Sequence, residues 1–163
     1  MREIGAMTPK AILIADDNPA DIVFVKLVLN EAKILNPIRS VESGDKTISY
    51  LKGEGNYSDR HLYPYPMLIF LDLKMPKTSG TEVLEWFRFR PEHQEVGIVA
   101  ITGVHNLQEV RQAYQMGAHS FLVKPFWKED LMNLLNGLKG IRLESKPGGG
   151  HYLDFDLSCF RVC

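Results

Sequence analysis

The sequence predicts a single α/β domain built on a parallel sheet that is covered by helices on both faces. The first observation is an alternation, in which short aliphatic or β-branched segments and longer segments of helical periodicity follow each other five times. The second is that the links between these segments are short, with residues 53–66 as the exception. The third is the continuous apolar character of residues 11–15, which is typical of a strand buried on both faces.

The elements follow in order from local signals. The strand at 11–15 stops at two aspartates, and a helix is expected at once, because Asn18 is a good N-cap and Pro19 suits the first helical position. We expect this helix to run to residue 32. A second strand is expected at 37–41 and a second helix at 45–51.

The second half repeats the pattern after a long interruption. Residues 53–66 have no periodicity and many breakers, which predicts a long surface loop. Ser79 and Glu82 form a capping box for a third helix. The remaining strands are expected at 67–71, 96–101 and 120–123. The third helix is expected to run through Arg88, the fourth from Asn106 to Met116 with Gly117 as its stop, and the last over 127–139.

Five strand–helix units joined by right-handed crossovers leave few topologies. We expect the flavodoxin-like (βα)5 arrangement, a doubly wound sheet of strand order 2-1-3-4-5. Residues 8–140 are assigned to this domain and residues 141–163 to a C-terminal tail.

Composition and charge exclude several classes of partner and location for the protein. The 163 residues carry a formal net charge of −1, which gives no field to attract nucleic acid or anionic lipid. The longest apolar run, 67–71, is far shorter than the roughly 20 residues of a membrane span. No apolar segment follows the first residues, and both Cys lie near the C-terminus, so we expect a cytoplasmic protein without a disulfide framework.

Polar residues stand at four of the five predicted strand ends: Asp16 and Asp17, Asp72, Thr102, and Lys124. Because the carboxyl ends of parallel strands share one edge of the sheet, these side chains are expected to converge there. Each has a simpler explanation, since aspartates favour helix starts and turns, and Thr or Lys can merely end a strand. Their joint placement favours a common site.

Three close carboxylates repel each other unless a cation lies among them, and oxygen ligands suit Mg²⁺. A carboxylate beside Mg²⁺ and a Lys can act as a nucleophile toward a phosphoryl group. The ammonium and a hydroxyl can bind the transferring oxygens. The site is therefore predicted to form and lose an aspartyl phosphate.

The segments around these residues resemble the receiver domain of bacterial two-component response regulators, the CheY-like family. The resemblance covers about residues 10–140 and rests on four motifs in the family's order and spacing. These are residues 12–18 (ILIADDN), 70–76 (FLDLKMP), 100–103 (AITG) and 124–126 (KPF).

The resemblance implies a role for each matching residue. Asp72 would accept a phosphoryl group from a sensor histidine kinase. Asp17 would bind Mg²⁺ directly and Asp16 partly through water, with Asp72 and the main-chain carbonyl of Lys74 completing the ligand set. We also hypothesise that the Lys74 side chain shields the acyl phosphate from water.

The resemblance also implies a switch. Thr102 and Lys124 would hold the phosphoryl oxygens, and the inward movement of Thr102 would free space for Phe121. Phe121 has no hydroxyl, so packing must carry such a switch, although it can also be a plain aromatic at the edge of the core. The family often has a cis peptide before the proline at Pro125.

The long loop and the segment 72–77 resemble regulators that are paired with phytochrome-type photosensor kinases. An alternative is a phosphatase or phosphotransferase of the haloacid-dehalogenase type, which also uses a nucleophilic Asp after a parallel strand. It needs an acid two residues later, and Lys74 stands there. A receiver that acts only as a scaffold would not need Asp72 and its partners. We therefore predict a signalling switch rather than an enzyme with a free substrate.

The tail is too short for a DNA-binding output domain, so output is expected through a partner protein or dimerisation. Residues 146–150 (KPGGG) are interpreted as a flexible link. Residues 153–159 alternate as a strand does and are expected either to pair with a sheet edge or to be a passive extension. His151, Cys159 and Cys163 form only a partial zinc-ligand set.

Overall fold

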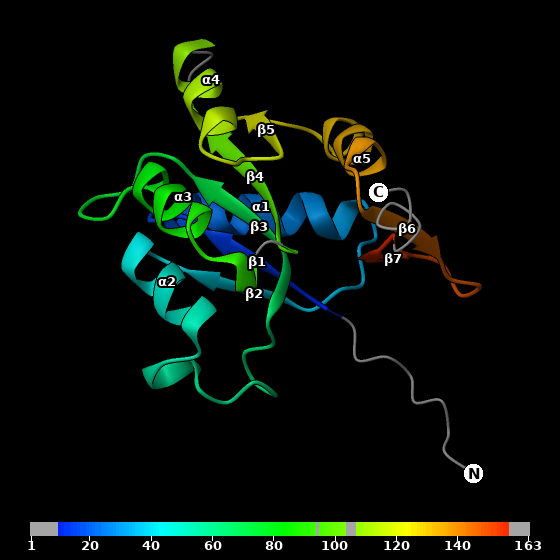
Figure 1. The fold of residues 1–163 in the computed structure, drawn as a ribbon. Coiled ribbons are helices and arrows are strands. Elements are labelled where there is room, and N and C mark those ends of the chain that lie inside the picture. The colour runs from blue at the N-terminus through cyan, green and yellow to red at the C-terminus, as the bar shows by residue number, and fades with distance from the viewer. Residues whose placement is uncertain (1–9, 94, 104–106, 157–163) are drawn as a thin grey trace.

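The computed structural model describes residues 10–93, 95–103 and 107–156 of the chain. Its main sheet is parallel and has the order β2-β1-β3-β4-β5, so the predicted topology is confirmed (Figure 1). The strands are β1 (Ala11–Ala15), β2 (Ile38–Val41), β3 (Pro66–Asp72), β4 (Gly97–Thr102) and β5 (Ser120–Val123). The helices are α1 (Pro19–Glu31), α2 (Gly44–Lys52), α3 (Gly80–Arg88), α4 (Leu107–Gln115) and α5 (Lys128–Gly137).

Helices cover both faces of this sheet, and each face has its own core. Ile12 and Ile14 of β1 belong to the cluster that α1 and α5 complete. Leu13 and Ala15 point the other way, into the cluster beneath α2, α3 and α4. All of β1 is therefore buried, which is why its sequence is continuously apolar.

The capping signals place the helix starts. Asn18 accepts the amide hydrogen of Ala20 at the start of α1, and the Ser79–Glu82 capping box opens α3. α2 begins one residue earlier than expected because Ser43 caps it. α5 ends at Gly137 instead of residue 139, since the backbone becomes extended at Leu138. The expected cap at Asn106 lies outside the described residues.

The predicted loop is found at residues 53–65, one residue shorter than expected because Pro66 begins β3, and it contains one short 3-10 helix, η1 (Gly55–Tyr57). The Arg60 guanidinium organises it by donating hydrogen bonds to the carbonyls of Tyr50, Leu51 and Tyr63 at 2.8–3.2 Å. Two of these carbonyls belong to the last turn of α2, where helix carbonyls lack partners within the helix. The loop is therefore fastened to the end of α2.

The C-terminal segment forms an antiparallel hairpin of β6 (Ile141–Ser145) and β7 (His151–Phe155), drawn in brown to red in Figure 1. The interpretation of 146–150 as a flexible link is wrong. Lys146 donates its amide hydrogen to the Gly150 carbonyl at 3.0 Å, and Gly149 and Gly150 adopt the positive φ values of 95° and 86° that the turn requires. The strand-like alternation was correct for β7, but its partner is β6 and not an edge of the main sheet.

The hairpin packs against the α1–α5 core. Leu153 is buried in it together with Ile141. The loop after α1 binds β7 through the backbone, since His151 donates to the Lys33 carbonyl and accepts from Leu35, both at 2.8 Å. Cys159 and Cys163 of the suggested zinc set lie outside the described residues, and His151 contacts Ser145.

In the part of the chain that the structure describes, no helix has the length and apolar character needed to cross a membrane.

Candidate functional site

The ends of β1, β3, β4 and β5 lie along one edge of the sheet, as the topology requires. Asp16 follows β1, Asp72 and Thr102 end β3 and β4, and Lys124 follows β5. The ladder continues into this edge, because the Lys124 amide donates to the Thr102 carbonyl at 2.8 Å. The predicted convergence of these polar residues is found.

Three carboxylates form the centre of the site. Asp16, Asp17 and Asp72 each offer one oxygen, and these oxygens lie within 4.8 Å of one another. Asp16 and Asp72 are buried, while Asp17 is exposed. Two fixed carboxylates beside one that faces solvent suit a hard cation such as Mg²⁺, which retains several waters. The donor set therefore fits the predicted metal.

Main-chain amides orient the two buried carboxylates. Asp16 Oδ1 accepts from the Asn18 amide at 2.9 Å, and Asp72 Oδ1 accepts from the Lys74 amide at 3.0 Å. The second oxygen of each faces Lys124: the Lys124 Nζ atom lies 2.8 Å from Asp16 Oδ2 and 3.7 Å from Asp72 Oδ2. Asp16 and Asp72 are therefore oriented in the same way: one carboxylate oxygen accepts from a main-chain amide, and the other faces the Lys124 ammonium.

Lys124 has another partner that the sequence analysis did not assign to the site. Its Nζ atom lies 2.7 Å from Asp21 Oδ2, on the first turn of α1. In the sequence alone, Asp21 is an ordinary acid in the first turn of a helix, where acids are common. A usable signal was its place in the first turn of the helix that follows β1, because helical side chains tilt toward the helix N-terminus and therefore toward this edge of the sheet.

Burial is the largest single influence on the pKa values of both Asp72 and Lys124, but it decides the direction of the shift only for Asp72. Burial raises the pKa of Asp72 to about 6, against the opposing effects of the Lys74 amide and the Lys124 ammonium. Burial tends to lower the pKa of Lys124, but the hydrogen bonds to Asp16 and Asp21 outweigh it and leave that pKa raised. Lys124 is therefore held as a cation beside a carboxyl that ionises with difficulty.

The proposed switch residues lie on neighbouring strands. Thr102 is buried, and its hydroxyl donates to Glu109 Oε2 of α4 at 3.4 Å, a contact that the sequence did not indicate. Phe121 is half-buried and packs edge-to-face on Tyr114 of α4, with ring centroids 6.0 Å apart. Both residues thus contact α4, and their switching role stays a prediction.

The remaining implied features are also placed. The Lys124–Pro125 peptide bond is cis. The Lys74 side chain is exposed next to the acceptor. Gly80, at the start of α3, packs so closely that a Cβ there would lie 2.2 Å from the main-chain oxygen of Asp72. The start of α3 therefore packs directly against the backbone of Asp72 and leaves no room for a side chain at Gly80.

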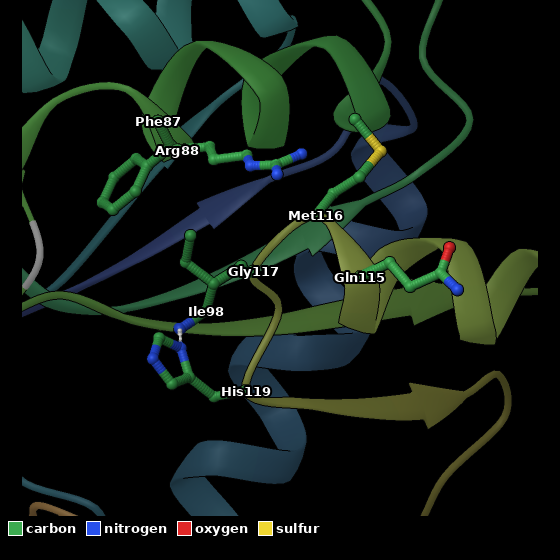
Figure 2. Close-up of a pocket in the computed structure, with 7 residues that line it drawn as sticks. All are labelled: Phe87, Arg88, Ile98, Gln115, Met116, Gly117 and His119. Atoms are coloured by element: carbon green, nitrogen blue, oxygen red, sulfur yellow. Dashed lines mark hydrogen bonds between the residues drawn. The ribbon is translucent and has the colours of Figure 1, made fainter.

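A pocket of about 230 Å³ lies between the C-terminal ends of α3 and α4, at the start of β4 (Figure 2). There the His119 ring accepts the Ile98 amide hydrogen through Nδ1 at 3.0 Å. The pocket contains none of the predicted site residues, and the sequence analysis did not anticipate it. Its lining residues are Phe87, Arg88, Ile98, Gln115, Met116, Gly117 and His119.

Comparison with known proteins agrees with this geometry. The response regulator receiver domain family matches residues 12–136. The response regulator Rcp1 of Synechocystis is 31% identical over 137 residues, which cover 84% of this chain and 91% of Rcp1.

Solved structures give the same result. The bacteriophytochrome response regulator RtBRR is 28% identical with a TM-score of 0.73, over 86% of each chain. Response regulator RPA3017, described in red light signalling of R. palustris, is 27% identical with a TM-score of 0.72, over 78% of this chain and 92% of its own. A Mn²⁺-bound form of Rcp1 aligns with a TM-score of 0.65 at 31% identity, over 79% of this chain and 91% of Rcp1.

Proposed function

The chain belongs to the response regulator receiver domain family, and we propose that it is a signalling switch that accepts a phosphoryl group on Asp72 from a sensor histidine kinase. One observation carries this proposal: the buried Asp72 carboxylate lies within 4.8 Å of two further carboxylates and 3.7 Å from the ammonium of Lys124. Such a group can receive a phosphoryl group whose charge the neighbouring cations balance.

In the proposed transfer, an Asp72 oxygen forms a bond to phosphorus while the bond from phosphorus to the kinase histidine nitrogen breaks. The histidine nitrogen keeps the bonding electron pair. Asp16, Asp17, Asp72 and the Lys74 carbonyl would hold Mg²⁺, which supplies charge neutralisation on the transferring oxygens. The Lys74 amide keeps Asp72 Oδ1 in place, and Oδ2 faces the ammonium.

Lys124 and Thr102 would then bind the phosphoryl oxygens. The Thr102 hydroxyl must leave Glu109 to do so, which would change the contact between β4 and α4. Phe121 lies beside this contact and can repack against Tyr114. In this way a local modification would alter the surface that α4 and β5 present to a partner.

We propose that the modification stays on the protein until water removes it, so the chain turns over no free substrate. The exposed Lys74 side chain beside the acceptor supports the suggested shielding role. The alternative of a phosphatase with an aspartyl-phosphate intermediate gains no support, since this Lys occupies the position of the required acid.

The similarity to a bacteriophytochrome response regulator, and to a regulator described in red light signalling, supports a phytochrome-like histidine kinase as the phosphodonor. Partner binding or formation of a homodimer would provide the output in the cytoplasm. We propose no binding to DNA or to membranes, and the net charge of −1 supports this because it provides no attraction to anionic surfaces. Residues 8–140 would be the phospho-acceptor domain, with the hairpin and the residues after it in 141–163.

The test is incubation with Mg²⁺ and acetyl phosphate, followed by intact mass measurement. The wild type is expected to gain the mass of one phosphoryl group, and Asp72→Asn is expected to gain none. No gain by the wild type, or an equal gain by both proteins, would overturn the proposal.

A further inference from the structure

One ammonium at this site is shared by three carboxylates at unequal distances. Lys124 Nζ lies 2.7 Å from Asp21, 2.8 Å from Asp16 and 3.7 Å from Asp72. The acceptor is thus the most distant of the three. The Lys124 side chain is 16% exposed and the Asp21 side chain 33%, so solvent screens this pair less than a surface pair.

Capping of α1 does not account for Asp21. Asn18 is the residue that caps α1, through the Ala20 amide. Asp21 instead directs Oδ2 across the site to a lysine 103 residues later in the chain. The pair ties the first turn of α1 to the residue after β5, and the position of the ammonium depends on it.

We propose that Asp21 is a positioning residue that holds Lys124 away from Asp72 until a phosphoryl group arrives. The part concerning the phosphoryl group rests on the function proposed above. In the unmodified protein, Asp21 and Asp16 hold the ammonium on the side of the cluster away from Asp72, which leaves room beside Asp72 for a divalent cation. In the modified protein, Asp21 competes with the phosphoryl oxygens for the same ammonium.

For Asp21→Asn, which keeps the shape of the side chain and removes its charge, we expect opposite changes in the affinity for Mg²⁺ and in the affinity for a phosphoryl analogue. Lys124 would move toward Asp72 and compete with the cation, so Mg²⁺ would bind more weakly. A phosphoryl analogue would meet an ammonium released from its competitor, so it would bind more tightly. A variant that merely disturbed the local structure would weaken both.

The experiment measures Mg²⁺ affinity by calorimetry and then beryllofluoride affinity at saturating Mg²⁺. For Asp21→Asn we expect the Mg²⁺ Kd to rise roughly threefold and the beryllofluoride Kd to fall roughly threefold, as suits one charge-assisted hydrogen bond at a partly screened site. Asp21→Glu keeps the charge and is expected to restore both values. Glu129→Gln is the matched control, since it removes an exposed first-turn acid from α5.

A Lys124→Met background shows whether Asp21 acts through the ammonium. There, Asp21→Asn is expected to leave the Mg²⁺ affinity unchanged; a persistent shift would mean that Asp21 acts by its field alone and would overturn the proposal. Shifts of equal sign, or none, while the wild type binds beryllofluoride would also overturn it. Failure of the wild type to bind beryllofluoride would refute the proposed function instead, and the Mg²⁺ measurements would then decide the role of Asp21.

Discussion

The side-chain amide of Asn36 makes both main-chain hydrogen bonds of Leu153, which lies 117 residues later in the chain. Asn36 Nδ2 donates to the Leu153 carbonyl at 3.0 Å, and Oδ1 accepts from the Leu153 amide at 2.7 Å. Nδ2 also donates to the Lys10 carbonyl at 2.9 Å. One buried side chain thus fastens the C-terminal hairpin to the start of β1.

Replacing this amide is expected to cost stability. Asn36→Ala leaves buried main-chain groups of Leu153 and Lys10 without partners, so we expect the free energy of unfolding to fall by about 2–4 kcal/mol. Urea denaturation followed by circular dichroism measures it. Asn30→Ala, an exposed position on α1, is the control and is expected to change little. Equal stability of the two variants would show that the hydrogen bonds of Asn36 add nothing to the stability of the fold.

Asp72 is expected to destabilise the metal-free protein at neutral pH. Its pKa is raised to about 6 from the ordinary value of 3.8, so ionisation of this carboxyl costs more free energy in the folded state than in the unfolded chain. The cost is full above pH 6 and vanishes as the pH falls below 3.8. With EDTA at pH 7.5, Asp72→Asn should raise the free energy of unfolding by roughly 2 kcal/mol.

Mg²⁺ is expected to offset the stability advantage of Asp72→Asn over the wild type. A ligand that binds only the folded state adds stability, so Mg²⁺ should raise the melting temperature of the wild type more than that of Asp72→Asn. Thermal unfolding with EDTA and with Mg²⁺ tests both halves. Equal responses of the two proteins to Mg²⁺ would remove Asp72 from the ligand set.

His93 is expected to add a pH dependence of its own. It is buried among Tyr65, Trp86 and Phe87, and burial lowers its pKa below the ordinary 6.5. The folded state therefore resists protonation, so its stability is complete above about pH 6.5 and declines as the pH falls below it.

The measurement compares urea denaturation at pH 7.5 and 5.5. His93→Gln should lose less stability than the wild type between these two values, whatever its stability at pH 7.5. His61→Gln, at an exposed position, should follow the wild type. A parallel decline in all three proteins would mean that His93 is not the titrating group.

The start of α3 is expected to be intolerant of a side chain. In Gly80→Ala the new Cβ would meet the main-chain oxygen of Asp72 at 2.2 Å, so the backbone of the acceptor must shift. We expect a loss of about 2 kcal/mol or more in the free energy of unfolding, as for overpacked sites. Labelling by acetyl phosphate should also slow. Gly137→Ala, where nothing lies within 4 Å, should be neutral or slightly stabilising, and the same loss there would point to a general glycine effect.

The shielding role of Lys74 makes a kinetic prediction. If its exposed side chain limits the access of water to the acyl phosphate, Lys74→Ala should shorten the phosphorylated lifetime severalfold. Intact mass measured over time after removal of the phosphodonor gives the lifetime, with Lys77→Ala as the control on the same loop. An unchanged lifetime would show that Lys74 is only a solvated loop residue.

Local patterns explain what the sequence could predict. β1, β3 and β4 are apolar because they are buried on both faces, and topology alone brings Asp16, Asp72 and Lys124 to one edge. These features need only the periodicity and order of the elements.

Contacts distant in sequence had no such signal. Asn36 resembles any loop residue, and its role appears only when Leu153 is beside it. Asp21 likewise resembles an ordinary helix-start acid until Lys124 is placed. β6 is different, because residues 141–145 (IRLES) do alternate between apolar and polar side chains, and the glycines after them favour a turn. The sequence therefore contains a local signal for β6, unlike the contacts of Asn36 and Asp21.

The bond between Asn36 and Leu153 also sets an order of events during synthesis. Asn36 leaves the ribosome long before Leu153, its hydrogen-bond partner, because the two are 117 residues apart and translation adds only about 5–20 residues per second. The α1 side of the core, which includes Leu153, cannot be completed until β7 has emerged. Nascent chains arrested before residue 153 should therefore be open to protease, and those with a C-terminal linker long enough to bring residue 153 out of the ribosome should be protected.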